Sequence, residues 1–224
     1  MVTFGEAGHC DVRVLDASMK TLWDEHGFRQ HFRLLIRGEE IEVEVPLAGR
    51  HNCMNAAAAI AVALESGVPA QTAVSGLGGI RPVKGRLYPQ VTASGLRIID
   101  DSYNANPDSV AAAISVLTAV GGNSVLVLGD LAELGDDPRG AHRQLGRAAR
   151  ELGVGRLYTL GPLSEAAAGE FGKGAMACMD IDTLVAALKQ ELGSEDVILV
   201  KGSRTARMER VVEALVSEDE EKAC

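Results

Sequence analysis

The sequence predicts an α/β fold in two parts: a short segment with antiparallel strands, then a Rossmann-like doubly wound, mostly parallel sheet. From residue 87 onward, strand patterns alternate with helix patterns. The continuous apolar runs VLVL (125–128) and VILV (197–200) are typical of strands buried on both faces. Before residue 76, by contrast, the strand pattern at 41–45 alternates apolar with acidic residues. The stretch GLGGIRPVKGR (76–86) predicts a hinge, so we expect one part at 1–80 and the other at 81–224.

The first part is expected to form a meander or hairpin followed by helices. Its strand patterns cover 11–16, 31–37 and 41–45, and the last of these alternates apolar with acidic residues. The alanine-rich stretch 52–66 predicts a helix, because alanine loses little side-chain entropy there, and Gly67 supplies a natural end. A second short helix is expected at 71–75.

The second part repeats a strand and helix unit. Asn106 followed by Pro107 predicts the N-cap and first residue of its first helix. We expect strands at 88–93, 96–101, 124–130, 156–161, 175–180 and 196–203, and helices from 107 and at 139–152, 163–170, 182–192 and 205–216.

Composition excludes several classes of protein. With 224 residues, 46% hydrophobic and 24% charged, the chain is long and apolar enough to fold around a core. A net charge of −9 argues against a broad surface for nucleic acid or anionic membranes. The 4 cysteines lie far apart without a CxxC pair, which disfavours a metal site. No apolar run is long enough to span a membrane, which needs about eighteen residues, and no signal-peptide pattern occurs. We expect a cytoplasmic protein without metal ligands of its own.

Polar clusters follow three apolar strands, where doubly wound sheets bind ligands. After LRII come Asp100 and Asp101, one of which is placed to accept hydrogen bonds from a ribose diol. Turn and cap chemistry explains the pair equally well, and the pattern does not choose between the two. Asp130 follows SVLVLG, where a loop aspartate that caps the next helix is the favoured interpretation. The combination of three such clusters favours a site.

The third cluster is cationic. Lys201, Ser203 and Arg204 surround a glycine at the start of the last helix, a natural site for a carboxylate or phosphate. The alternative is a set of solvated basic residues. Near the hinge, Arg86 suits a nucleotide phosphate, although a lone arginine is more often a surface residue.

The motif GRHNCMN (49–55) opens the alanine-rich helix. Asn52 is a plausible N-cap, whereas Asn55 lies in the first turn, where asparagine is a poor helix former. Two side-chain amides at i and i+3 would share a helix face and suit the edge of an adenine. His51 is expected to be solvated or structural.

Several nucleotide and hydrolase motifs do not occur. The sequence has no GxxxxGK[ST], no GxGxxG opening a strand and helix unit, no HExxH and no GxSxG. A phosphate loop and a dinucleotide fingerprint are therefore both missing from these 224 residues.

Five segments in order resemble the Mur ligase family. They are GRHNCMNAAAAIAVA (49–63), GRLY (85–88), IDDSYNANPDSV (99–110), LGDLAELGDDPRGAH (128–142) and VKGSRTARMERVVEAL (200–215). The forms DDSYNANP and LGDLAELG resemble the branch that adds D-alanyl-D-alanine to a UDP-N-acetylmuramoyl-tripeptide for peptidoglycan. The resemblance covers the last part of the central ATPase domain and the whole C-terminal domain. It leaves open whether the chain is an expressed fragment or a truncated reading frame.

The resemblance implies an ATP-dependent ligase reaction, in which a carboxylate is phosphorylated and an amine then attacks the acyl phosphate. It implies that Asn52 and Asn55 contact the adenine, that Arg86 reaches the phosphates and that Asp101 holds the ribose. It further implies that the acceptor site is lined by Tyr103, Asn104, Asn106, Lys201, Ser203 and Arg204. The Mg²⁺ ligands of the family lie upstream of the matched region, and no residue here is assigned with certainty to catalysis.

We therefore expect this chain to be a portion of a ligase and to be inactive alone. The complete enzyme is expected to bind ATP, D-alanyl-D-alanine and the UDP-linked tripeptide. We expect no nucleic-acid or membrane partner. The alternative is a stand-alone nucleotide- or peptide-binding α/β module without catalysis. A Rossmann-type oxidoreductase is a third hypothesis, which rests on the fold pattern alone.

Overall fold

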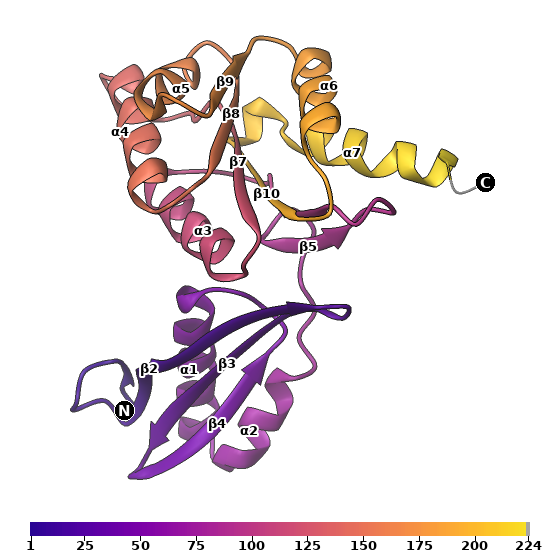
Figure 1. Cartoon of the computed structure of the whole chain (residues 1–224). Helices are drawn as coiled ribbons and strands as arrows, with labels where there is room; N and C mark the ends of the chain where they lie inside the picture. Colours follow the sequence, from indigo (N-terminus) through magenta and orange to yellow (C-terminus); the bar gives the residue numbers. More distant parts are fainter. Residues whose placement is uncertain (223–224) are drawn as a thin grey trace. The chain divides into compact units, whose positions relative to one another are not determined.

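The computed structural model describes residues 1–222 of the chain, with side chains to residue 217. These residues form two compact units, which divide between Pro82 and Val83 (Figure 1). Among the described residues, no helix is both long enough and apolar enough to cross a membrane.

The first unit is a four-stranded sheet in the order β1-β2-β3-β4. Strands β2 (Val12–Asp24), β3 (Gly27–Ile36) and β4 (Glu39–Val45) are antiparallel, as expected, and the short strand β1 (Phe4–Gly5) pairs in parallel with β2. Strand β2 continues eight residues beyond its expected end at Asp16, because Lys20–Asp24 pair with Gly27–His31 in a hairpin.

Two helices, α1 (Arg50–Glu65) and α2 (Ala70–Leu77), complete this unit. Alternation along β3 buries every second side chain, so that Phe28, Phe32 and Leu34 are at most 2% exposed. The same face packs against the buried side of α1, which includes Cys53 and Ile60. The fold of this unit therefore follows the expected α/β pattern.

The second unit is a six-stranded sheet in the order β5-β6-β10-β7-β8-β9. Five strands are parallel and β5 is antiparallel at the edge, which confirms the expected fold class. The strands are β5 (Tyr88–Val91), β6 (Arg97–Asp101), β7 (Asn123–Gly129), β8 (Arg156–Leu160), β9 (Ala175–Cys178) and β10 (Asp196–Lys201).

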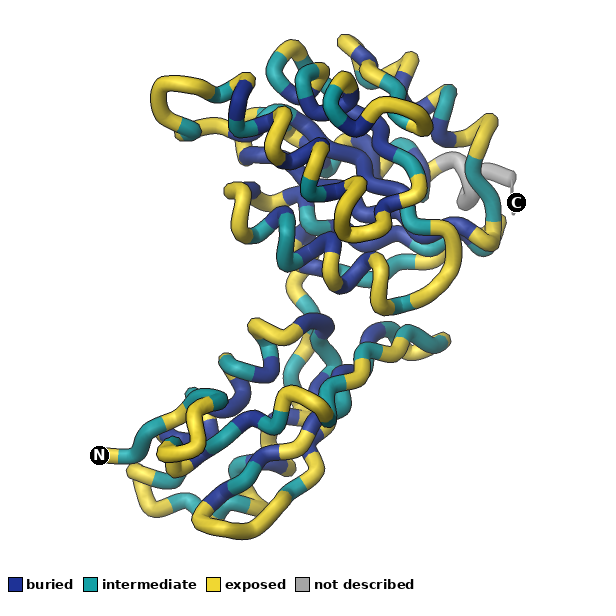
Figure 2. The backbone as a smooth tube through the Cα atoms, turned by 60° about the vertical axis from the view of Figure 1, so that its left-hand side comes forward, coloured by how far each residue is buried: buried dark blue, intermediate teal, exposed yellow. Residues whose placement is uncertain are grey.

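Helices cover both faces of this sheet. Figure 1 shows α3, α4 and α5 on one face and α6 and α7 on the other. Their bounds are α3 (Pro107–Ala119), α4 (Pro138–Glu151), α5 (Glu165–Phe171), α6 (Ile181–Glu191) and α7 (Glu209–Lys222). Every residue of β10 is buried, as the apolar run VILV predicts, and the central strands form the dark blue interior in Figure 2.

The last helix begins later than the predicted residue 205. A short 3₁₀ helix covers Arg204–Ala206, and Arg207 then adopts a left-handed conformation with φ of 52°. Because a residue in that conformation cannot continue a right-handed helix, α7 starts only at Glu209.

The strand order places the carboxyl ends of β6, β10 and β7 next to one another, although β10 is the last strand in the sequence. Lys201 pairs with Asp101 on one side and with Leu128 on the other. The three polar clusters of the sequence follow these three strands. The topology therefore gathers them at one edge of the sheet.

The packing of α4 against α5 predicts different effects on stability for alanine substitutions at two helical glycines, Gly146 and Gly169. A Cβ on Gly146 would lie 2.1 Å from the backbone oxygen of Ala167 in α5. Gly146→Ala is expected to lower the free energy of unfolding by about 2 kcal/mol or more, because the neighbouring atom is backbone and has little room to move. Urea denaturation measures this change.

Gly169→Ala is the matched control. This glycine lies in α5, and a Cβ there would meet nothing within 4 Å. Its free energy of unfolding should rise by up to about 1 kcal/mol, because alanine is the better helix former. Equal effects of the two substitutions would contradict the close contact between the helices.

Candidate functional site

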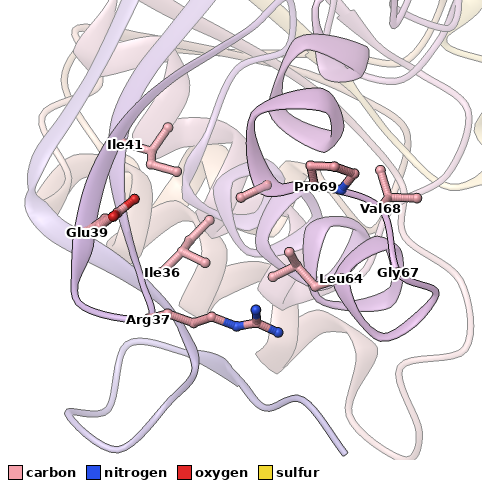
Figure 3. A pocket seen from close by; sticks show the side chains of 9 residues that line it. Ile36, Arg37, Glu39, Ile41, Leu64, Gly67, Val68 and Pro69 are labelled. Atoms are coloured by element: carbon pink, nitrogen blue, oxygen red, sulfur yellow. The ribbon is translucent and has the colours of Figure 1, made fainter.

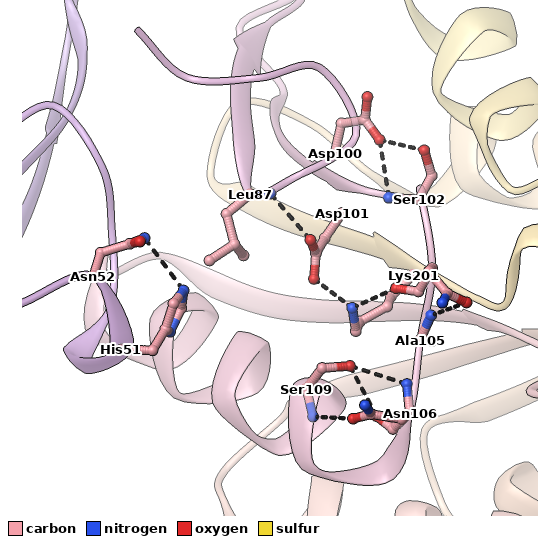
Figure 4. Close-up of polar contacts among 11 residues, drawn as sticks. His51, Asn52, Leu87, Asp100, Asp101, Ser102, Ala105, Asn106, Ser109 and Lys201 are labelled. Carbon is pink, nitrogen blue, oxygen red and sulfur yellow. Dashed lines mark hydrogen bonds and ion pairs between the residues drawn. The ribbon is translucent and has the colours of Figure 1, made fainter. Parts of the chain in front are cut away.

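The ends of β6 and β10 are joined by a buried ion pair. Lys201 Nζ lies 2.6 Å from Asp101 Oδ2 and donates a second hydrogen bond, of 2.9 Å, to the carbonyl oxygen of Asn104 (Figure 4). The Lys201 side chain is 2% exposed and that of Asp101 14%. Asp101 Oδ1 also accepts a hydrogen bond from the backbone N–H of Leu87, at 3.1 Å. Asp101 is thus held from two sides.

Its neighbour Asp100 points into the protein. Asp100 is fully buried and accepts hydrogen bonds from the backbone N–H groups of Gly85 and Ser102, both at 3.1 Å, and from Ser102 Oγ at 2.6 Å. These bonds fold residues 100–102 against the Gly85 turn. The sequence pattern does not distinguish the two adjacent aspartates. In the structure, Asp100 bonds to the neighbouring turn, whereas Asp101 pairs with Lys201.

A second connection joins β10 to β7. Ser203 donates from both its backbone N–H, at 3.1 Å, and its Oγ, at 2.6 Å, to the carbonyl oxygen of Asp130. The Asp130 carboxylate accepts from the N–H groups of Ser164, at 2.7 Å, and Leu163, at 3.1 Å, at the start of α5. The expectation that Asp130 caps the next helix was therefore wrong, since Asp137 caps α4.

The loop after β7 is anchored by His142, which the sequence analysis missed. His142 is fully buried, and its Nε2 lies 3.1 Å from the backbone N–H of Leu131. Its Nδ1 lies 2.7 Å from the carbonyl oxygen of Pro138. Because Leu131 donates to Nε2, Nδ1 must carry the proton that it donates to Pro138, which fixes a neutral tautomer. No local sequence signal marks this contact, which spans 11 residues.

The asparagines after β6 serve the local backbone. Asn106 Oδ1 accepts from the N–H of Ser109 at 2.8 Å, and Ser109 Oγ accepts from the N–H of Asn106 at 3.0 Å. This capping box confirms the expected start of α3. Asn104 Oδ1 accepts a hydrogen bond from the N–H of Ala105, at 2.9 Å. Asn104 itself is exposed.

Tyr103 carries two guanidinium groups near its ring. The Cζ atom of Arg86 lies 4.3 Å from the ring centroid and that of Arg204 lies 5.7 Å from it. Both distances are within the range of cation–π contacts. Of the expected acceptor cations, Arg204 presents its charge to solvent with 65% of its side chain exposed, whereas Lys201 is enclosed.

In the first unit, the amides of the α1 motif lie on one helix face. Asn55 Nδ2 donates to Asn52 Oδ1 at 3.3 Å, and Asn52 Nδ2 donates to the carbonyl oxygen of Ala48 at 2.8 Å. His51 Nε2 lies 3.2 Å from the same Asn52 amide (Figure 4). Asn52 is not the N-cap, because the helix begins at Arg50 and its N-cap is Gly49, with φ of 98°. Only glycine adopts that conformation readily.

A buried glutamine fixes this helix start. Gln30 Oε1 accepts from the N–H of Gly49 at 3.0 Å and from Thr21 Oγ1 at 2.7 Å, and Gln30 is 1% exposed. The sequence holds a signal for it, since Gln30 occupies a position on the buried face of β3 between Phe28 and Phe32. A polar residue on an apolar face needs a partner.

Cys53, which follows Asn52 in α1, is fully buried. Burial raises the pKa of Cys53 to about 12, so its thiol stays protonated at neutral pH. Residues 1–217 contain no group of three His, Cys, Asp or Glu side chains arranged to hold a metal ion.

Two cavities lie outside the predicted residues. One, of about 420 Å³, belongs to the first unit and is bordered by Ile36, Arg37, Leu64 and Pro69 (Figure 3). The other, of about 480 Å³, belongs to the second unit and is lined by Asp130, Gly161, Met179, Asp180, Thr205 and Arg210, among others. Thr205, the residue that follows Arg204 in the sequence, lines the second cavity.

The chain belongs to the Mur ligase family. The profile described as "Mur ligase, glutamate ligase domain" matches residues 85–204, and that of the "Mur ligase middle domain" matches residues 1–63. The first match alone covers more than half of the chain.

Similar proteins include UDP-N-acetylmuramoyl-tripeptide–D-alanyl-D-alanine ligases. The enzyme of Escherichia coli is 42% identical over 177 residues, which are 78% of this chain and 39% of that protein. The enzyme of Bacillus subtilis is 35% identical over 96% of this chain and 47% of its own length. The chain thus spans less than half the length of these relatives.

Solved structures agree with this fold. MurF from Acinetobacter baumannii, 34% identical, superposes with a TM-score of 0.82 over 96% of this chain and 46% of that one. MurF from Thermotoga maritima in complex with ADP superposes with a TM-score of 0.83 over 99% of this chain and 49% of that one. At 24% identity, the latter supports the fold alone.

The buried ion pair yields a stability prediction. Lys201→Met should lower the free energy of unfolding by about 3 kcal/mol, because it leaves the largely buried Asp101 carboxylate without its cation. Arg147→Met is the matched control, since it removes the exposed Arg147–Glu170 pair and should cost under about 1 kcal/mol. Urea denaturation of both variants measures the difference, and equal midpoints would contradict a stabilising role for Lys201.

Proposed function

We propose that this chain forms the nucleotide- and acceptor-binding part of an ATP-dependent ligase that joins D-alanyl-D-alanine to UDP-N-acetylmuramoyl-tripeptide. The family and the names of the relatives support the reaction class. The observation that carries the proposal is the Asp101–Lys201 pair at the junction of two parallel strands, where doubly wound sheets bind nucleotides.

Asp101 is proposed to hold the ribose hydroxyls. A carboxylate has about four acceptor positions, enough to accept hydrogen bonds from both hydroxyls of a ribose diol. Asp100 is a poor candidate, because it is fully buried and folds the neighbouring turn. The fixed position of Asp101 would spare the ligand the entropic cost of ordering this side chain.

Asn52 and Asn55 are proposed to contact the adenine. The edge of an adenine presents both a donor and an acceptor, which a side-chain amide matches. Contact between the two amides shows that they share one helix face at the first turn of α1. Arg86 is proposed to bind the ATP phosphates, for which its exposed guanidinium has the right charge and shape.

The acceptor dipeptide is proposed to bind near Tyr103, Asn104 and Asn106. The exposed guanidinium of Arg204 has the charge to bind the dipeptide carboxylate. The next residue, Thr205, lines the cavity of about 480 Å³. Lys201 and Ser203 support this region from within, because both are 2% exposed and already bonded to Asp101 and Asp130.

We propose that the 224 residues alone do not turn over substrate. No GxxxxGK[ST] phosphate loop occurs in them, and the amide-forming reaction requires the γ-phosphate of ATP to be held in line with its acceptor. The C-terminal unit would then act by closing on nucleotide that is bound elsewhere in the complete enzyme.

A chimaera tests the reaction. This chain replaces the segment of the E. coli ligase that it matches, and ADP release is measured with and without D-alanyl-D-alanine. The chimaera should require all three substrates. Arg86→Ala and Asp101→Ala should each raise the KM for ATP about tenfold or more, because each removes a hydrogen bond that involves a charged group.

Arg143→Ala, on the exposed side of α4, serves as the control and should leave the KM unchanged. Unchanged kinetics in both site variants would contradict the nucleotide assignment. An inactive chimaera, together with saturable ADP binding by the chain itself, would favour the stand-alone binding module instead.

A further inference from the structure

Tyr103 is an exposed aromatic residue that two arginines approach. Tyr103 is 47% exposed, and the guanidinium carbons of Arg86 and Arg204 lie 4.3 Å and 5.7 Å from its ring centroid. Among residues 1–217, the Arg86 side chain forms no ion pair with a carboxylate, whereas Arg204 Nη1 lies 3.6 Å from Glu209 Oε1. The ring is therefore the main contact of the Arg86 cation.

The main chain brings the ring and Arg86 together. The N–H of Tyr103 donates to the carbonyl oxygen of Gly85 at 3.1 Å, and the N–H of Arg86 donates to that of Val83 at 3.0 Å. Gly85 has φ of 80°, and a Cβ there would lie 3.3 Å from Tyr103 Cβ. The stacking of Arg86 is thus set by a tight backbone turn.

The arrangement concentrates positive charge in an acidic protein. The chain carries a net charge of −9, yet two guanidinium groups lie beside one ring and repel each other. The negative face of the ring offsets part of this repulsion. Oxyanions bound to the two guanidinium groups would offset the rest, and guanidinium forks bind phosphate and carboxylate oxygens in pairs.

We propose that Tyr103 is a positioning residue that holds Arg86 and Arg204 as one paired oxyanion site. Arg86 takes a phosphate and Arg204 a carboxylate, so the ring sets the separation of the two bound oxyanions. The identity of these oxyanions as nucleotide phosphate and acceptor carboxylate rests on the proposed function. The paired site itself rests on the contacts of Tyr103.

The first test follows the arginine Nε–Hε signals of the ¹⁵N-labelled 224-residue chain by NMR. Tyr103→Leu removes the ring current and should shift the signals of Arg86 and Arg204, whereas Tyr103→Phe should leave them near their original positions. Tyr88→Leu is the control, because no guanidinium stacks on Tyr88 among the described residues. Unmoved signals in Tyr103→Leu would overturn the proposal.

The second test titrates inorganic phosphate, and separately D-alanyl-D-alanine, into the same proteins. In the original chain, phosphate should shift the Arg86 signal and the dipeptide the Arg204 signal. Tyr103→Leu should raise the Kd for each ligand by about fivefold or more. Tyr103→Phe should bind within about twofold of the original chain, because the ring and not the hydroxyl holds the cations.

Two outcomes of the titration overturn the proposal: equal affinities in Tyr103→Leu and the original chain, or loss in Tyr103→Phe as large as in Tyr103→Leu. If Tyr103→Leu does not fold, the original chain still decides, because the proposal fails when neither ligand moves either arginine signal. An ADP titration separates the two levels of inference. Phosphate binding at the pair without ADP binding would contradict the proposed function and leave the paired site intact.

Discussion

The candidate site depends on one constraint, the insertion of β10 between β6 and β7. This order places a lysine at the end of the most buried strand, where an unpaired ammonium would be strongly destabilising. Lys201 is tolerated there because Asp101 and a carbonyl oxygen satisfy it. The same ion pair fixes the carboxylate that we assign to the ribose. Stability and the proposed nucleotide recognition would therefore depend on one interaction.

The backbone around this pair is organised by the neighbouring aspartate. Asp100 folds the Gly85 turn against the end of β6, and that turn places Leu87 against Asp101 and Arg86 against Tyr103. Adjacent residues with opposite orientations thus divide the work, since one builds the turn and the other faces the edge of the sheet. In the first unit, Gln30 has the corresponding role for the start of α1.

Local patterns in the sequence predicted the fold class, most element positions and the gathering of polar clusters, because apolar runs, caps and strand ends are local features. They could not predict strand order, and so missed the Lys201–Asp101 pair, whose members are 100 residues apart. They left Asp100 and Asp101 equal, because the choice depends on a contact with Gly85. Two cap assignments, those of Asn52 and Asp130, were wrong because tertiary partners supplied other hydrogen bonds. The roles of the site residues toward ligands stay predictions.

The central position of the last strand also has a consequence for how the chain acquires its structure. Strands β6 and β7 have no direct pairing with each other, and both pair with residues 196–201. During synthesis, β6 and β7 therefore each keep one unpaired edge until residues 196–201 have been made. The slow step of folding should then be the insertion of β10, whose contacts are far apart in the sequence. A ribosome that pauses before residue 196 would hold an unfinished, aggregation-prone sheet, whereas the first unit has all of its strands by residue 45.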